Sequence, residues 1–345
     1  MKKFKVGIIG MGRMGKNHLE LIEEYSNFAK VKAVCDLKFD SNVEDLLKKY
    51  KVKDKYFDYK DLLADALIDV VYVCTDIDSL CGISMNAIKA NKHTFCESNL
   101  SKKPEDIKNL MEVLKTKKTV FHVGLNKRFD NNFRSVKDVL VSGKIGEAHI
   151  IKITSRDPDL PSLDYLKKSG GLFFDMSVDD FDMIRYLSSF EIEEVYARGG
   201  VLIDEMVKKY DDIDTAVLSL KLSNGTLCLI DNSRRATYGY DQRVEIHGSL
   251  GMVTTSNELQ SKAKIYTTYG VIAEKPKYLI IQRYKQAYII QNEYFFTSIL
   301  NNDVNLSSCN DSLQALYVAL AAKKSFEQNR SVKISEIKSN EKEKE

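Results

Sequence analysis

The chain has 345 residues, of which 43% are hydrophobic and 29% are charged. This length allows two ordinary domains, because a single hydrophobic core rarely grows beyond about 250 to 300 residues. The 52 Lys and Arg residues nearly balance the 49 Asp and Glu residues, for a net charge of +3. Their even spread argues against a nucleic-acid partner, and the lack of an apolar run of roughly 18 residues argues against a membrane partner.

The six cysteines contain no Cys-x-x-Cys pair and lie mostly in apolar, strand-like runs. Reduced, buried thiols of this kind are typical of cytosolic proteins, so we predict a cytoplasmic protein without a structural zinc site. The first residues, MKKFKVGIIG, contain too short an apolar stretch for a signal peptide and are interpreted as a strand.

Short β-branched runs alternate with amphipathic segments from Lys3 to Gly124. The runs are KVGII, VKAVCD, VVYVCT, HTFCE and TVFHVG. This alternation predicts an α/β Rossmann domain with a doubly wound parallel sheet over residues 1–125.

Two helix starts in this domain carry local signals. Ser41 and Glu44 form a candidate capping box before an apolar stretch. Pro104 suits the first turn of a helix that ends near Lys118.

The pattern changes after Arg128. We expect a helix at 131–142, a strand at 149–155 and one strong helix after 170–171. The strand patterns TAVLSLKL, TLCLIDNS and RVEIHG then dominate, with a hairpin signal at Asn224-Gly225. Helices around 285–300 and 312–328 close the pattern. It predicts an α+β domain with a large open, mostly antiparallel sheet over residues 126–335, followed by a flexible tail at 336–345.

A glycine motif follows the first predicted strand and opens the first predicted helix. Gly10, Gly12 and Gly15 form Gly-x-Gly-x-x-Gly. These glycines permit a tight turn and the close approach of a pyrophosphate to the helix start. Asp36 lies 21 positions after Gly15 at the end of the second predicted strand, where a carboxylate accepts hydrogen bonds from the adenosine ribose. The motif predicts NAD as cofactor; the alternative is a glycine-rich turn beside a solvated aspartate.

The charge of Asp36 favours NAD over NADP, because a carboxylate repels a 2′-phosphate. Lys38, two residues later, is a mild argument for NADP. A lysine at such a position is more often just a surface lysine.

Several longer segments resemble the Gfo/Idh/MocA oxidoreductases, and the chain looks closest to the inositol-oxidising members of that family. The segments are VGIIGMGRMGKNH, SRDP, SGGLFFDM, DDFDMIRYL and YGYDQR, and the similarity runs from Lys5 to about Val332. The resemblance implies hydride transfer between a polyol or sugar and a nicotinamide. It also implies an open C-terminal sheet used for oligomerisation, in a homodimer or homotetramer.

The chain differs from the family at the family's catalytic signature. The family has Glu-Lys-Pro at the end of the fifth strand, and this chain has Glu97, Ser98 and Asn99 there. The missing lysine would stabilise a developing alkoxide, an effect that contributes about 3 to 4 kcal/mol in a preorganised site.

A second signature, Asp followed four residues later by His and then by Asp, lacks its histidine. Asp175 and Asp182 are present, and Asp179 stands at the histidine position. Alcohol oxidation needs a base for the hydroxyl proton, and we hypothesise that Asp179 is this base, with Asp175 beside it. The i, i+4, i+7 spacing places the three aspartates on one helix face, where repulsion raises at least one pKa. Alternatively Asp179 has no chemical role, or the three carboxylates bind a divalent metal; no other metal ligand is evident, so none is predicted.

The resemblance marks further candidate residues. They are Thr75 and Glu97 for the cofactor, and Asp157, Asp182 and Tyr238 or Tyr240 for the substrate. Arg128 follows the sixth predicted strand, where strand ends face the ligand crevice, and is a candidate for holding a polyol group. Each of these residues is also explained as an ordinary turn, strand or surface residue.

The histidines receive no catalytic role. His18 matches a common family residue, but a histidine without a partner cannot replace the lost base, so a structural role is predicted. The other histidines, which are expected to be packed or at the surface, are His93, His122, His149 and His247.

Two functions remain. The first is an NAD(H)-dependent oxidoreductase of a polyol or sugar that uses altered acid–base groups. The second is a catalytically impaired relative that binds NAD(H) as a sensor or structural partner, which the loss of both Lys and His favours.

Overall fold

The computed structural model describes residues 3–303 and 307–342, which divide into two compact units. The first unit runs to Phe129 and also includes Gln286–Leu316; the second comprises Asp130–Lys285 and the residues from Tyr317 onward. The predicted boundary at 125–126 lies close to Phe129, where the chain first passes from the first unit to the second. The return of Gln286–Leu316 to the first unit does not follow from the sequence, because an amphipathic pattern does not show which core a helix joins.

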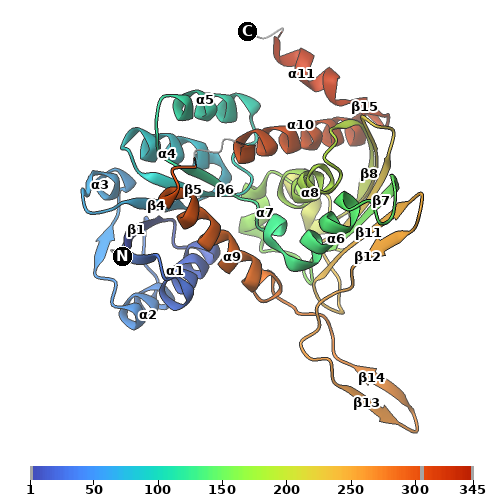
Figure 1. Ribbon diagram of the computed structural model, residues 1–345, viewed down its shortest axis with the longest axis horizontal. Coiled ribbons are helices and arrows are strands. Elements are labelled where there is room, and N and C mark those ends of the chain that lie inside the picture. Colours follow the sequence, from blue (N-terminus) through green and yellow to red (C-terminus); the bar gives the residue numbers. More distant parts are fainter. Residues whose placement is uncertain (1–2, 304–306, 343–345) are drawn as a thin grey trace. The chain divides into compact units, whose positions relative to one another are not determined.

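Six strands form the sheet of the first unit, in the order β3-β2-β1-β4-β5-β6 (Figure 1). They are β1 (Phe4–Ile9), β2 (Ala29–Cys35), β3 (Asp54–Tyr56), β4 (Val70–Val73), β5 (His93–Glu97) and β6 (Phe121–Gly124). All neighbouring pairs are parallel, which confirms the predicted Rossmann sheet. The sequence pattern misses β3, because its three residues form no apolar run.

Helices connect these strands as in other βαβ units. They are α1 (Arg13–Tyr25), α2 (Ser41–Tyr50), α3 (Tyr59–Ala64), α4 (Ile77–Lys89) and α5 (Pro104–Lys115), and they are followed by the short 3₁₀ helix η1 (Asn126–Phe129). Pro104 begins α5 as predicted, although the helix ends three residues before Lys118. Parts of α9 (Ile280–Leu300) and α10 (Ser307–Gln328) also belong to this unit.

The start of α2 corrects the predicted capping box. Asp40, not Ser41, is the N-cap, and its carboxylate accepts a 2.8 Å hydrogen bond from the backbone N–H of Val43. Ser41 is already the first helical residue, so the box predicted for Ser41 and Glu44 is wrong by one position. Aspartate and serine are similarly good N-caps, and spacing alone did not separate these two neighbours.

Aromatic side chains from distant parts of the sequence fill the core of the first unit. The rings of Tyr72 and Phe95 stack with centroids 4.6 Å apart. Phe295 and Phe296 of α9 pack against them. The buried Tyr72 hydroxyl donates a 2.8 Å hydrogen bond to Oδ1 of Asn292. Buried aromatic rings contribute strongly to stability, so α9 completes this core.

Seven strands form the sheet of the second unit, in the order β12-β11-β7-β10-β9-β8-β15. They are β7 (Ala148–Arg156), β8 (Ile192–Gly200), β9 (Thr215–Leu222), β10 (Leu227–Ser233), β11 (Asp241–Gly248), β12 (Met252–Thr254) and β15 (Val332–Lys333). In the described part of this sheet only β7 and β10 are parallel neighbours, which confirms the predicted mostly antiparallel sheet. The hairpin predicted at Asn224-Gly225 joins β9 to β10.

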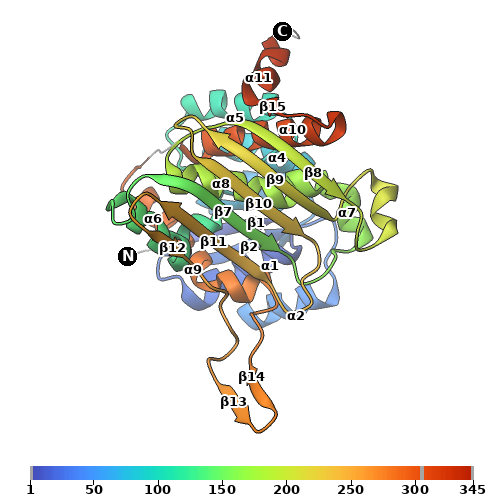
Figure 2. The same ribbon diagram turned by 90° about the vertical axis from the view of Figure 1, so that its right-hand side faces the viewer.

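One face of this sheet is covered and the other is open. Figure 2 shows the sheet face-on with α8 (Val178–Ser188) behind it, and no described helix of this unit lies over the near face. The remaining elements of the unit are α6 (Asn131–Val141), α7 (Leu163–Ser169), the π turn η2 (Phe173–Ser177), the 3₁₀ helix η3 (Glu205–Tyr210), the hairpin of β13 (Lys264–Thr267) and β14 (Gly270–Ala273), and α11 (Ile334–Lys342).

The end of the chain is helical as far as residue 342. Residues 336–342 of the predicted flexible tail continue α11, and residues 343–345 lie outside the described part. The flexibility of this segment stays a prediction. The charge-rich sequence suggested a frayed end, but Glu336 forms ion pairs with Lys324 and Arg330. Among the described residues, no helix is long and apolar enough to cross a membrane.

Candidate functional site

The turn between β1 and α1 contains the predicted glycine motif. At two of its three glycines a Cβ atom would collide with a backbone carbonyl oxygen. Gly10 has a φ of +92°, and a Cβ there would lie 2.5 Å from the carbonyl oxygen of Cys74. A Cβ on Gly15 would lie 1.9 Å from the carbonyl oxygen of Gly10. Gly12 differs, because among the described residues no atom outside its chain neighbours and the adjoining helix backbone lies within 4 Å of its Cβ position. The absence of a side chain there leaves open space beside the start of α1.

This space fits the pyrophosphate of a dinucleotide. Gly12 is the N-cap of α1 and makes no side-chain hydrogen bond to the first turn, which contains no acidic residue. Backbone N–H groups and the helix dipole bind anions at such a start. The residues present therefore fit NAD.

Three predicted cofactor residues lie at the carboxyl ends of strands in the parallel sheet, where dinucleotides bind in such sheets. Asp36 follows β2, and its Oδ2 accepts a 2.6 Å hydrogen bond from the backbone N–H of Met11 in the glycine turn. Thr75 follows β4 and accepts a 2.8 Å hydrogen bond from the Ser79 hydroxyl. Glu97 is the last residue of β5. The structure thus brings Gly10, Gly12, Gly15, Asp36, Thr75 and Glu97 to one edge of the sheet.

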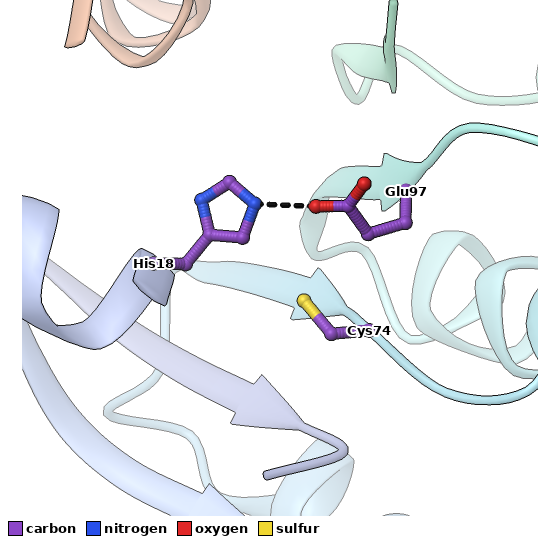
Figure 3. A group of neighbouring side chains, drawn as sticks. All are labelled: His18, Cys74 and Glu97. Carbon is purple, nitrogen blue, oxygen red and sulfur yellow. Dashed lines mark hydrogen bonds and ion pairs between the residues drawn. The ribbon is translucent and has the colours of Figure 1, made fainter. Parts of the chain in front are cut away.

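Glu97 pairs with a buried histidine (Figure 3). His18 Nε2 and Glu97 Oε1 are 2.6 Å apart, and the side chains are 0% and 15% exposed. The His18 ring lies against Tyr72 and Phe95, with centroid distances of 5.0 and 4.9 Å. The expectation that His18 lacks a partner is therefore wrong, because Glu97 is its partner and the pair joins α1 to β5.

Cys74 lies beside this pair, and the three residues are possible metal ligands with donor atoms within 4.8 Å of one another (Figure 3). One feature argues against a metal. Among the described residues His18 Nδ1 has no hydrogen-bond partner, whereas a metal-bound histidine normally donates from its second nitrogen.

Arg128 of η1, predicted to bind substrate, forms an ion pair within the first unit. Its Nη1 lies 2.7 Å from Oδ2 of Asp311, and both side chains are less than one-fifth exposed. The pair ties η1 to α10. A substrate contact at Arg128 stays a prediction.

A buried arginine holds Asp175 in the second unit. Arg234 is fully buried and donates a 2.9 Å hydrogen bond to Asp175 Oδ2, while the Tyr165 hydroxyl donates to the other oxygen. Arg234 also lies 3.5 Å from Asp212. Burial raises the pKa of Asp212 in spite of this attraction. The Arg234 guanidinium attracts the Asp175 carboxylate. This attraction offsets part of the repulsion among the three aspartates that was expected to raise a carboxyl pKa.

The segment that carries the three predicted aspartates is not one regular α-helix. The π turn at Phe173–Ser177 contains Asp175, and α8 begins only at Val178. Hydrogen bonds in a π turn run from i to i+5, so the α-helical spacing assumed between Asp175 and Asp179 is wrong. Asp182 is buried and Asp179 is partly exposed. Asp179 is thus the more accessible of the two.

Asp157 and Tyr238 lie at the same edge of the second sheet, where the parallel strands β7 and β10 end. The Asp157 backbone N–H donates to the carbonyl of Ser233 at 2.9 Å. The Tyr238 hydroxyl accepts a 3.1 Å hydrogen bond from Arg156 and donates a 2.6 Å bond to Asp241. These contacts fix the Tyr238 hydroxyl among charged groups.

Two features of this edge escaped the sequence analysis. Arg234 directly follows β10, and no pattern of strand residues shows that its side chain is fully buried. Asn232 accepts a 2.6 Å hydrogen bond from Ser177 and donates a 2.8 Å bond to Asp180. Asp180 is the next residue after Asp179 in the sequence. It was not predicted to be a site residue, because the family signature includes the position of Asp179 and not that of Asp180.

Comparisons with known proteins agree with this architecture. Residues 4–125 match the family described as "Oxidoreductase family, NAD-binding Rossmann fold", and residues 133–254 match the "GFO/IDH/MocA C-terminal domain". The chain is 38% identical to the myo-inositol 2-dehydrogenase of Thermotoga maritima, with 96% of this chain and 99% of that protein covered. It is 36% identical to the inositol 2-dehydrogenase of Rhizobium meliloti, with the same shares covered.

A solved structure shows the same fold. The scyllo-inositol dehydrogenase of Lactobacillus casei, determined with bound NAD(H) and scyllo-inositol, is 29% identical with a TM-score of 0.90. The comparison covers 97% of this chain and 100% of that chain. The chain belongs to the Gfo/Idh/MocA family of oxidoreductases, and its first unit is the NAD-binding Rossmann domain of that family.

Proposed function

We propose that this chain is an NAD-dependent dehydrogenase of inositol or a closely related polyol. Its similarity to inositol dehydrogenases over 96% of its length carries the proposal. The polar groups of Asp157 and Tyr238 at one edge of the second sheet support a polyol substrate, because carboxylate and phenol oxygens can bond to hydroxyl groups.

Bound NAD supplies a nicotinamide ring that accepts hydride from the substrate carbon. In this proposal the N–H groups at the start of α1 bind the pyrophosphate, and Asp36 binds the adenosine ribose. Thr75 and Glu97 flank the cofactor at the same sheet edge. Asp179 accepts the proton of the substrate hydroxyl in place of the family's histidine, and Asp175 is oriented by Arg234 beside it.

Arg128 and Asp182 are retained as substrate-binding candidates. Both side chains are largely buried, and Arg128 is bound to Asp311. A direct contact from Arg128 would therefore require substrate to share its guanidinium with Asp311.

The second candidate function is an NAD(H)-binding relative with little or no turnover. Ser98 and Asp179 favour it, because they replace the lysine and the histidine of the family's catalytic signatures. A serine hydroxyl does not provide the positive charge that a lysine offers to a developing alkoxide.

The test is NADH formation by concentrated protein with NAD and a panel of inositols and sugars across a broad pH range. We expect slow turnover of at least one inositol. Asp179→Asn should lower kcat strongly and leave NADH binding intact. NADH binding without turnover of any polyol would favour the second function.

A double variant tests whether the pocket is intact. Ser98→Lys with Asp179→His should raise kcat, because it restores both groups of the family signature. The two single variants, Ser98→Lys and Asp179→His, are the controls, since each restores only one group of the family signature. A double variant no more active than wild type would contradict the proposed roles of positions 98 and 179.

We also propose a cytoplasmic homodimer or homotetramer. All six cysteines are free thiols, as a reducing compartment maintains. The open face of the second sheet carries the exposed side chains of Ile150, Val217, Leu227 and Leu229, and a hollow of about 400 Å³ lies over β7 to β10. An apolar face of this kind suits self-association.

A further inference from the structure

Two donors from different elements hold the side chain of Asp175 in the second unit. Nη1 of Arg234, the residue that follows β10, donates a 2.9 Å hydrogen bond to Oδ2 of the carboxylate. The hydroxyl of Tyr165 in α7 donates a 2.5 Å hydrogen bond to the other oxygen, Oδ1. The Asp175 side chain is 12% exposed. Each oxygen of this largely buried carboxylate therefore has its own donor.

These two donors restrict the carboxylate more than one donor would. The last torsion of an aspartate side chain joins an sp³ carbon to an sp² carbon and has a broad energy minimum. With one hydrogen bond the carboxylate plane still rotates about that bond, whereas a donor on each oxygen fixes the plane. An ionised carboxylate has about four acceptor positions, so two donors leave roughly two positions for a substrate hydroxyl. Tyr165 and Arg234 together decide in which direction those positions point.

The arginine donor is firmly anchored. Arg234 is fully buried, and its backbone N–H donates a 2.8 Å hydrogen bond to the carbonyl of Asp214. Its Nη2 lies 3.5 Å from Oδ2 of Asp212. The other oxygen of Asp212 accepts a 2.8 Å hydrogen bond from the backbone N–H of Leu172, which directly precedes the π turn η2. Arg234 is thus tied to the turn that carries the carboxylate it holds.

The tyrosine donor lies on a short helix near the surface. Tyr165 is 40% exposed, and α7 has seven residues. Ser162 caps this helix, because its hydroxyl accepts a 3.3 Å hydrogen bond from the backbone N–H of Tyr165. Gly170 and Gly171, with φ values of +87° and +99°, then join α7 to the turn that contains Asp175. The hydroxyl of Tyr165 can therefore be removed without disturbing a buried charge.

We propose that Tyr165 is a positioning residue, which together with Arg234 fixes the direction in which the Asp175 carboxylate meets a substrate hydroxyl. This role rests on the proposed function, in which Asp175 lies beside the base Asp179. Tyr165 acts through Asp175 and needs no contact with the substrate itself. A misplacement of about 1 Å in an active site lowers the rate by about 100-fold. Loss of the Tyr165 hydroxyl should consequently lower kcat.

The test is Tyr165→Phe in the full-length protein, because this change removes the hydroxyl and keeps the ring. With an inositol that wild type oxidises, kcat should fall at least about tenfold, while the dissociation constant of NADH stays within about twofold of wild type. Tyr266→Phe, which removes a hydroxyl from the exposed strand β13, is the matched control and should act as wild type does.

Two kinetic results would overturn the proposal. The first is a kcat of Tyr165→Phe equal to that of wild type. The second is a fall in kcat that is matched by an equal loss of NADH binding, because that result indicates a general structural role and not the positioning of Asp175.

A second measurement needs no turnover and so separates this role from the proposed function. Amide hydrogen exchange of residues 163–169 reports how often α7 opens. In Tyr165→Phe it should be at least about fivefold faster than in wild type, because a hydrogen bond to a carboxylate is lost, while exchange elsewhere stays unchanged. Exchange at the wild-type rate would overturn the proposal. Faster exchange beside a wild type that oxidises no polyol would support the restraint on Asp175 and count against the proposed function alone.

Discussion

Gly12 and Gly15 show two different uses of the same residue type within one turn. Gly15 is required by the protein itself, since its Cβ would lie 1.9 Å from a backbone oxygen. Gly12 faces open space, so its lack of a side chain matters only when a ligand approaches. The sequence motif predicted all three glycines but did not distinguish these roles, which depend on the positions of neighbouring backbone atoms.

The two glycines therefore respond differently to alanine. Gly15→Ala should destabilise the protein by about 2 kcal/mol or more, because a backbone carbonyl must move to admit the Cβ. Gly12→Ala should leave the melting temperature unchanged and weaken NADH binding at least about tenfold, because the methyl group occupies the space for the pyrophosphate. Thermal melts and titration of NADH fluorescence measure these effects. If Gly12→Ala binds NADH as wild type does, the pyrophosphate does not lie there.

Asp36 combines a structural and a selective role. Asp36→Asn keeps an oxygen that can accept the hydrogen bond of Met11, but it removes the charge that repels a 2′-phosphate. We expect weaker NADH binding and tighter NADPH binding, so that the ratio of the two dissociation constants shifts by about tenfold or more. Lys38→Ala is the companion variant. A loss of NADPH affinity in Lys38→Ala would show that this lysine contacts the phosphate.

The elements differ in how well local sequence predicted them. Strands with apolar runs and helices with a clear 3.6-residue period were predicted correctly. Several strands were missed. β3 has three residues, and the hairpin of β13 and β14 has no buried face, but β8 has nine residues, of which the last two are glycines. The π turn at Phe173–Ser177 was missed for another reason. Its i to i+5 hydrogen bonds do not change the spacing of apolar residues in a way that the sequence shows.

The N-cap of α2 can be tested directly by substitution. Asp40→Ala should cost about 1 kcal/mol, because it removes the acceptor for the backbone N–H of Val43. Ser41→Ala should change stability by less than about 0.5 kcal/mol, because Ser41 already lies inside the helix. Urea unfolding monitored by circular dichroism distinguishes the two. A larger loss in Ser41→Ala would restore the capping box predicted from sequence.

For the whole molecule, the fold was more predictable than the site. The alternation of strands and helices predicted the first sheet, and apolar strand patterns with a hairpin signal predicted the second. The glycine motif and the family signatures marked residues at the carboxyl ends of strands in the first sheet and beside the second sheet. The partners of those residues were not predictable, since Arg234 lies 59 positions from Asp175 and Glu97 lies 79 positions from His18. Such pairs depend on three-dimensional packing, which no local pattern records.

His122 links overall stability to pH. Burial lowers its pKa from 6.5 to about 3, with a smaller contribution from Arg128. The unfolded chain therefore binds a proton before the folded chain does, and stability falls as the pH drops from 6.5 towards 3. From pH 7 to pH 5 this one group should cost about 2 kcal/mol.

Urea titrations at several pH values test this expectation. His122→Gln retains a polar group beside Gln291, which lies 3.1 Å from the imidazole, and should lose less stability on acidification than wild type. His149→Gln is the control, because His149 is exposed. Parallel losses in wild type and His122→Gln would show that other groups dominate the acid response.

The return of α9 to the first unit affects the order of events during synthesis. Tyr72 and its partner Asn292 are 220 residues apart, a length that a ribosome translates in about 10 to 40 s. Throughout that interval the nascent Rossmann sheet exists without Phe295 and Phe296, which complete its core. The unfinished domain thus presents apolar surface to the cell while the second unit is still being made. A nascent chain released before residue 296 should consequently be retained by chaperones, although it already carries the entire glycine motif and every strand of the nucleotide-binding sheet.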